Sequence, residues 1–247
     1  MRTAILLCGM PREFPETWES FIENLYSQMP NPDVYIYAPS PYEVPEFFSI
    51  VKPKAYVVEP QFRHTHLEPF LSSIGFYAEH RIDPTIQQFY GLKKVWELKQ
   101  SVGEKYDLVI RTRPDLIYLT PITLDILDTE ELNNLHANFA PSMCTEFAAG
   151  PEHLIEKYCG IYDWLDGEGR KLLDQNNPRL NYPLDHKYNC DLLMISYIED
   201  YLGIQLARQR LPKETPSPYD YYRIMGRHKK GEYIYEGADA YLKNSKV

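Results

Sequence analysis

The sequence predicts an α/β fold in which a central, mostly parallel sheet is flanked by helices. Strand-like and helix-like segments follow one another through the first half of the chain, which is the pattern of a sheet with helical crossovers. Within 106–115, Val109 and Ile110 form a continuous apolar step, as expected for a strand covered on both faces. The clearest helical period of the chain precedes that strand. We therefore expect one α/β domain.

The chain opens with a short apolar run that predicts a buried strand, and Gly9 and Pro11 end it in a turn. Thr17 is a candidate cap for a helix, because apolar residues recur at helical spacing after it. Strand, helix, strand and strand is the opening order of a nucleotide-binding α/β half. The expected elements are a strand at 3–7, a helix at 17–29 and strands at 33–37 and 55–58.

A long helix is predicted from Pro84 to about Ser101, and Gly103 ends it. The preceding segment, 59–83, has no steady period. It contains His64 and His66, which could face one side of a strand as metal ligands or lie solvated in a polar loop.

The second half holds shorter elements. Small residues around Gly150 allow a ligand or another stretch of backbone to approach closely. The tail from 212 onward is rich in tyrosine and has no period. The expected elements are a strand at 116–119, a capped segment at 125–132, a strand at 135–139, a strand end at 145–150 that leads into a helix from Pro151, and a helix at 185–202.

The composition limits the classes of partner. Lys and Arg number 26 against 35 Asp and Glu, and the resulting formal charge of −9 argues against a nucleic-acid partner, which needs a basic face. The four cysteines show no C-x-x-C spacing, which favours a reducing, cytoplasmic location. No stretch approaches the roughly 18 apolar residues of a bilayer span, so we expect no transmembrane segment.

The end of the strand at 106–115 carries the most informative polar residues. Pro114 cannot donate to a central ladder, so the strand must stop there. Arg111, Arg113 and Asp115 then lie at the strand end and in its loop, where open α/β sheets place their chemistry. Together they could hold a phosphate with a metal ion or a sugar hydroxyl. The alternative is an Arg–Asp surface ion pair beside a proline turn.

Several nucleotide-binding and hydrolase signatures are absent from the sequence. No G-x-G-x-x-G follows the first strand, and no G-x-x-x-x-G-K-[ST] occurs anywhere. A G-x-S-x-G elbow is also missing. The sequence therefore lacks the main motif of three enzyme classes: dinucleotide dehydrogenases, P-loop enzymes and serine hydrolases.

Three segments carry a resemblance to a known family: 5–12 (ILLCGMPR), 88–96 (QFYGLKKVW) and 106–115 (YDLVIRTRPD). Together they resemble the small bacterial and viral glycosyltransferase-like proteins linked to surface polysaccharide synthesis. The resemblance covers roughly the first 160 residues. It implies a GT-A fold, a single Rossmann-like domain over 1–247, with a nucleotide-binding half at 1–120 and an acceptor half plus tail at 121–247.

The resemblance also implies a donor site. In GT-A enzymes an Asp-x-Asp triplet reaches the donor diphosphate through a divalent metal, and here Arg113, Pro114 and Asp115 occupy that place. Asp115 could therefore be a ligand of Mn²⁺ or Mg²⁺, or Arg113 could offset the diphosphate charge directly. Whether a metal is needed stays open. The implied donor-binding residues are Gly9, Met10, Pro11, Arg12, Gln88, Arg111, Arg113 and Asp115.

Some of these residues have ordinary structural alternatives. Arg12 could be a surface arginine, and Gln88 could cap its helix or be solvated. For the reaction itself, an inverting transfer needs a carboxylate that accepts the acceptor's proton. Glu146, which precedes the small residues before Pro151, is the first candidate, and Asp191 and Asp185 compete with it, although acids in a first helical turn often only complement the helix dipole.

The predicted activity is the transfer of a sugar from a nucleoside-diphosphate sugar to a glycan or glycolipid acceptor. Two alternatives remain. A sugar-phosphate nucleotidyltransferase has similar architecture, but its glycine-rich first loop differs from the 9–12 loop, which has one glycine and no lysine. A non-catalytic nucleotide- or carbohydrate-binding module is the other.

Overall fold

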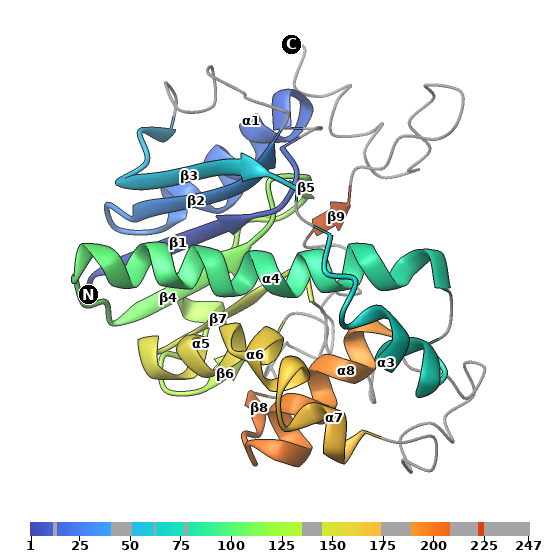
Figure 1. The fold of residues 1–247 in the computed structure, drawn as a ribbon. Coiled ribbons are helices and arrows are strands. Elements are labelled where there is room, and N and C mark those ends of the chain that lie inside the picture. The colour runs from blue at the N-terminus through green and yellow to red at the C-terminus, as the bar shows by residue number, and fades with distance from the viewer. Residues whose placement is uncertain are drawn as a thin grey trace.

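The computed structural model describes residues 1–11, 14–40, 51–61, 63–76, 79–134, 145–173, 189–207 and 222–224. Within them, a seven-stranded sheet has the order β3-β2-β1-β4-β7-β6-β8 (Figure 1). Four of its strand pairs are parallel, and the two that involve β7 are antiparallel. The expected α/β class with a mostly parallel central sheet is confirmed.

The parallel core of the sheet comes from the first half of the chain, and shorter strands extend it. A second sheet, of two antiparallel strands, pairs distant segments. The strands of the main sheet are β1 (Thr3–Cys8), β2 (Asp33–Ser40), β3 (Ala55–Pro60), β4 (Leu108–Thr112), β6 (Leu132–Asn133), β7 (Ala148–Gly150) and β8 (Leu206–Ala207); those of the second are β5 (Leu116–Tyr118) and β9 (Tyr222–Ile224).

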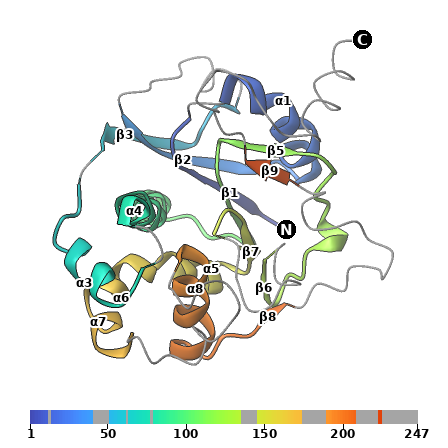
Figure 2. The ribbon, with the colours of Figure 1, turned by 90° about the vertical axis from the view of Figure 1, so that its right-hand side faces the viewer.

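Helices cover both faces of the main sheet. The end-on view of α4 (Glu79–Val102) shows it on one face, with α1 (Phe14–Asn24) on the other (Figure 2). Most of the remaining helices pack on the α4 side. They are α3 (Glu68–Ser73), α5 (Glu152–Cys159), α6 (Ile161–Asp166), α7 (Gly169–Leu172) and α8 (Cys190–Ile195); the short turns are η1 (Tyr26–Gln28), η2 (Leu124–Ile126) and the π-helical η4 (Ser196–Tyr201).

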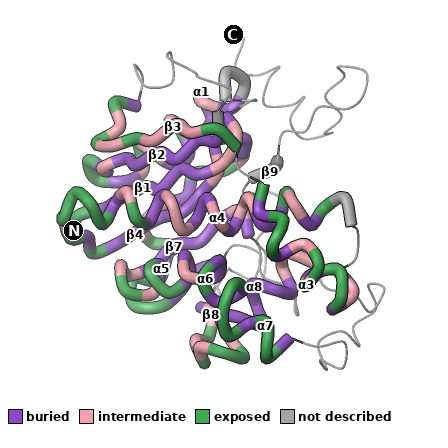
Figure 3. The backbone as a smooth tube through the Cα atoms, viewed as in Figure 1, coloured by how far each residue is buried: buried purple, intermediate pink, exposed green. Residues whose placement is uncertain are grey.

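The central strands are buried on both faces, as Figure 3 shows for β1 and β4. In β1, Leu6 and Cys8 face the core under α4, whereas Ile5 and Leu7 face the core under α1. This follows from the two-residue period of a strand combined with an unbroken apolar run. Each such buried aliphatic side chain contributes about 1.5–3 kcal/mol to folding.

The first helix differs from its expected bounds. It begins at Phe14 and ends at Asn24, so the expected cap at Thr17 is wrong. Thr17 lies inside the helix, fully buried, and its hydroxyl donates a 2.6 Å hydrogen bond to the carbonyl of Pro114. A tertiary contact to the loop after β4 therefore occupies the hydroxyl that the sequence pattern assigned to a cap.

The long helix was predicted to start at Pro84, but α4 starts at Glu79. Proline is favoured in the first turn of a helix, where its missing N–H removes no hydrogen bond, so the sequence predicts a helix that begins at Pro84. The earlier turn is helical because Ile82 is buried in the core that α4 shares with the sheet. Tertiary burial thus outweighs the hydrogen bond that Pro84 cannot donate.

Other expectations on the second half are met in part. The strand at 116–119 exists as β5, but it belongs to the second sheet. The capped segment at 125–132 is only the short turn η2. Of the helix expected at 185–202, the described part is α8 and η4, whereas residues 185–188, with the candidate Asp185, lie outside the described residues. The strand expected at 135–139 lies outside the described residues. No helix in the described part of the chain is long and apolar enough to cross a membrane.

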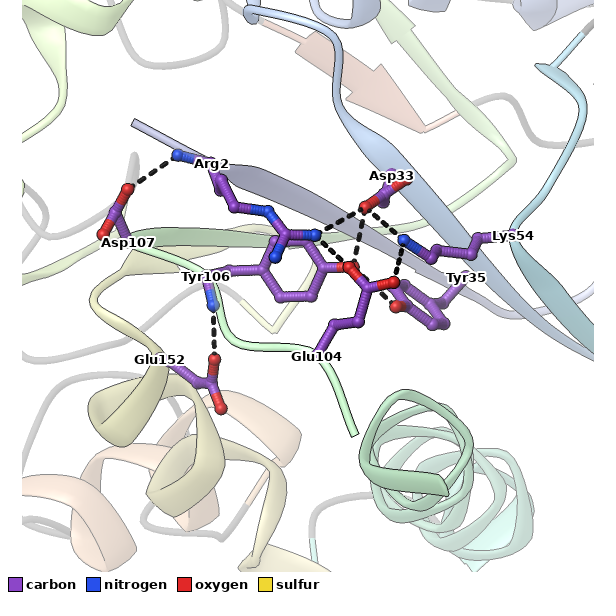
Figure 4. Close-up of polar contacts among 8 residues, drawn as sticks. All are labelled: Arg2, Asp33, Tyr35, Lys54, Glu104, Tyr106, Asp107 and Glu152. Carbon is purple, nitrogen blue, oxygen red and sulfur yellow. Dashed lines mark hydrogen bonds and ion pairs between the residues drawn. The ribbon is translucent and has the colours of Figure 1, made fainter. Parts of the chain in front are cut away.

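A group of paired polar side chains gathers where four parallel strands begin; we call Arg2, Asp33, Lys54, Glu104 and Tyr106 the amino-edge cluster (Figure 4). Lys54 Nζ lies 2.8 Å from an Asp33 oxygen and 2.5 Å from a Glu104 oxygen. Arg2 pairs with Glu104, and the Tyr106 hydroxyl donates to Asp33 at 2.8 Å. The cluster links the starts of β1, β2, β3 and β4 at one edge of the sheet.

Candidate functional site

The strand order places a topological switch point beside β1. From β1 the chain moves through α1 to β2 and β3 on one side, and then returns through α4 to β4 on the other side. The loops after β1 and β4 therefore leave adjacent strand ends at the carboxyl edge of the sheet. In open α/β sheets, ligands bind in the crevice outside such a point. The candidate site is built around these two loops.

The loop after β1 rests directly on the loop after β4. Gly9 has φ +143°, a conformation that residues with a side chain rarely adopt, and its N–H donates to Tyr37 O at 3.3 Å. A Cβ at this position would lie 3.4 Å from Pro114 Cδ. Met10 is half-buried and Pro11 is buried beside it. Arg12, the charged member of the expected donor loop, lies outside the described residues.

Arg113 and Asp115 form a two-pronged ion pair at this edge. Arg113 Nε and Nη2 donate to the two carboxylate oxygens of Asp115 at 2.8 and 2.5 Å. Their side chains are only 22% and 11% exposed. The alternative of an Arg–Asp pair beside a proline turn is therefore present, although the pair is sheltered rather than on the surface. Both oxygens of Asp115 are occupied by Arg113, so a ligand of either residue must compete with this pair.

The antiparallel pairing of β7 with β4 brings Glu146 to the same edge. Arg111 pairs with Ala148, and two further steps along this register set Glu146 opposite Arg113. The pKa of Arg113 agrees with that position: burial lowers it, but Asp115 and then Glu146 raise it, and the net change is a rise. Glu146 thus adds a second negative charge near Arg113.

Asp191 faces Glu146 from the start of α8. Asn189 caps that helix by accepting a 2.8 Å hydrogen bond from Leu192 N, and the hydroxyl of Thr145 donates to Asp191 Oδ1 at 3.3 Å. Burial, and after it the negative charge of Glu146, raise the pKa of Asp191 to about 7. We call Glu146 and Asp191 the carboxylate pair. It can take up or release a proton near neutral pH, which suits general acid–base chemistry.

Two expected donor-binding residues point away from the loops and into the protein. Arg111 has no exposed surface; its Nε and Nη2 each lie 3.4 Å from Cys8 Sγ, and Nη1 donates to the Thr145 carbonyl. Gln88 Nε2 donates to that same carbonyl at 3.0 Å. The structure therefore joins Gln88 and Arg111 at the Thr145 carbonyl, whereas Arg113 and Asp115 pair with each other.

Sequence reasoning missed Thr145 and Tyr158. Thr145 supplies the carbonyl that Arg111 and Gln88 contact, and the Tyr158 hydroxyl lies 3.5 Å from the same oxygen. No local pattern marks a main-chain oxygen as a site, so only the antiparallel placement of β7 could have identified it. The small residues at Gly150 do allow a close approach, and it is by backbone: a Cβ there would lie 2.8 Å from Glu131 O.

The two histidines of the 59–83 segment have separate environments. His64 is buried, and its Nδ1 lies 2.8 Å from the Tyr162 hydroxyl, so a solvated loop position is wrong for it. Burial, and then His66, lower the pKa of His64. His66 is half exposed and its Nε2 lies 3.3 Å from Asp166. Over the described ranges, no group of three or more His, Cys, Asp or Glu side chains is arranged to hold a metal ion.

No protein-family model matches this chain, and no curated protein matches its sequence.

Proposed function

We propose that this protein is a GT-A-type glycosyltransferase that moves a sugar from a nucleoside-diphosphate sugar to a glycan or glycolipid acceptor. One observation carries the proposal: at the switch point of the sheet, Glu146 lies near both Arg113 and Asp191, so the carboxylate pair and a cation share one edge. A group that exchanges a proton near pH 7 and a cation that offsets an anionic leaving group are the two things that sugar transfer requires.

The proposed step assigns a role to each group. The acceptor oxygen attacks the anomeric carbon, and the bond from that carbon to the diphosphate oxygen breaks. The acceptor's proton passes to the ionised carboxylate of Asp191. Arg113 offsets the charge that develops on the diphosphate, because the guanidinium keeps N–H groups beyond those that it donates to Asp115 and these can donate to phosphate oxygens. Gly9 of the loop after β1 packs against Arg113 and Pro114 beside the proposed donor position.

The resemblance to GT-A enzymes also implies a metal ion bound by Asp115. A single carboxylate holds Mg²⁺ or Mn²⁺ weakly, and both oxygens of Asp115 already accept hydrogen bonds from Arg113. The residues do not fit a metal while that ion pair is closed. Arg113 is therefore the group that offsets the diphosphate charge in the proposed step.

Thermal unfolding with a panel of UDP-, GDP-, CMP- and dTDP-sugars tests the proposal, each with Mn²⁺ and with EDTA. A donor at 100 times its Kd stabilises the folded state by about 2.7 kcal/mol, which raises the melting temperature. Arg113→Ala should abolish the rise. Arg63→Ala is a matched control, because Arg63 makes the same forked pair with Glu68 on an exposed surface. If no nucleotide sugar raised the melting temperature, the proposal would be wrong.

A non-catalytic binding module is the second candidate, because the closed Arg113–Asp115 pair is also what a purely structural ion pair would look like. Asp191→Asn separates the two. In a transferase this variant binds the donor with wild-type affinity but loses transfer, whereas in a binding module neither protein transfers sugar. Release of nucleoside diphosphate in the presence of acceptor glycans is the measurement.

A further inference from the structure

The carbonyl of Thr145 is a meeting point for three side chains from three elements. It accepts hydrogen bonds from Arg111 on β4, from Gln88 on α4 at 3.0 Å and from Tyr158 on α5 at 3.5 Å. A carbonyl oxygen has two lone pairs, so three donors saturate it. The main chain at Thr145 is therefore fixed from three directions just before β7.

Arg111 lowers the stability of the fold at this position more than an apolar side chain would. Its side chain is fully buried, and among the described residues it forms no ion pair with a carboxylate; its partners are the Cys8 sulfur and the Thr145 carbonyl. An unpaired buried charge costs several kcal/mol, whereas an apolar side chain would fill the same space without that penalty. Such a local conflict with stability is expected where a residue serves a site.

The fixed residue connects directly to both members of the carboxylate pair. Glu146 is the next residue along the chain, and the Thr145 hydroxyl donates to Asp191 at 3.3 Å. That hydrogen bond favours the ionised carboxyl and opposes the burial that raises its pKa. The position of one residue thus governs where both carboxylates lie and how readily Asp191 loses its proton.

We propose that Arg111 is a positioning residue: its buried guanidinium fixes the main chain of Thr145, and through Thr145 it holds the carboxylate pair in place. The catalytic meaning of this role rests on the proposed function, but the role itself does not. Arg111 touches neither donor nor acceptor in this scheme. Its effect on Asp191 is transmitted by a single hydrogen bond.

The test is a ¹³C NMR titration of the Asp191 carboxyl, assigned by comparison with Asp191→Asn, in protein without ligand. Thr145→Val removes the hydroxyl and should raise the pKa of Asp191 by about one unit. Arg111→Met should raise it similarly, because the hydroxyl loses its position. Thr145→Ser, which keeps the hydroxyl, should titrate as the wild type does.

A double-mutant cycle then tests whether Arg111 acts on Asp191 through Thr145. If Arg111 acts through Thr145, the double variant shifts no further than Thr145→Val alone. If the two shifts in the pKa of Asp191 were additive, the Arg111 charge would act on Asp191 directly and the proposal would be overturned. It would also be overturned if the pKa of Asp191 stayed at the wild-type value in the variants while their stability fell. If Arg111→Met does not fold, Arg111→Lys replaces it, since lysine keeps the charge but lacks the fork that reaches Cys8 and Thr145. Because no substrate is present, a failure to bind nucleotide sugars would count against the proposed function and leave this result standing.

Discussion

Replacement of Asp191 by asparagine should change how stability depends on pH. The carboxyl of Asp191 has a pKa of about 7 in the folded protein, against an ordinary value of 3.8. Between these two pH values the folded state holds a proton that the unfolded chain has released. The contribution of Asp191 to the free energy of unfolding therefore falls as pH rises from about 4 to about 7, and then stays level.

The size of the effect follows from the shift. A difference of about three pKa units, at about 1.4 kcal/mol per unit, corresponds to about 4 kcal/mol as an upper figure. Asparagine has almost the same shape but does not titrate. The stability of Asp191→Asn relative to the wild type should therefore improve by up to about 4 kcal/mol between pH 4.5 and pH 8.

Urea unfolding of both proteins at pH 4.5, 6 and 8 measures this difference. Glu130→Gln, which removes one charge from an exposed turn, controls for the change in net charge. Glu146→Gln should shrink the effect, because the charge of Glu146 is the second cause of the raised pKa of Asp191. A difference between wild type and Asp191→Asn that is flat across this range would refute the burial of Asp191 beside Glu146.

Three further changes test the framework of the site, each by urea unfolding at pH 7. Gly9→Ala should cost about 1–3 kcal/mol, because φ +143° strains any residue with a side chain. Gly150→Ala should cost about 1–3 kcal/mol for a different reason, since its Cβ would lie 2.8 Å from the Glu131 carbonyl. Glu152→Gln should cost about 3–5 kcal/mol, because it leaves the fully buried Lys99, 2.6 Å away, without its counter-charge. Burial, the largest single effect, raises the pKa of Glu152, but the contacts with Lys99, Tyr106 N–H and Lys105 together lower it by more, so the net change is a lowering and this stability should be present at neutral pH and be lost on acidification. A cost below about 0.5 kcal/mol, the range of ordinary surface changes, would contradict the geometry at that position.

The central strands could be predicted because their signal is local. An apolar run that ends near a glycine or proline marks a buried strand, as in β1, β2 and β4, whereas β3, at the edge of the sheet, is only partly buried. The helix starts could not be placed in the same way. Thr17 and Pro84 have strong local preferences, but a contact with Pro114 and the burial of Ile82 override them.

The sequence predicts which loops form the site, but not how the side chains of the site are arranged. Because carboxyl ends of parallel strands share one edge, the loops that contain Gly9 and Arg113 were expected to lie together, and they do. Arg111 is buried inside β4, whereas Arg113 lies just beyond its last residue, and the sequence does not specify that strand end to one residue. The position of Glu146 depends on an antiparallel pairing between segments far apart in the chain.

The amino-edge cluster has a consequence for how this protein can change. Its ion pairs and hydrogen bonds connect the starts of β1 to β4 at the edge opposite the candidate site. Loop residues at the carboxyl edge can therefore be exchanged while the alignment of the strands is kept. Libraries that vary 9–13 and 113–115 together, with the cluster left intact, are a practical route to altered ligand preference on this scaffold.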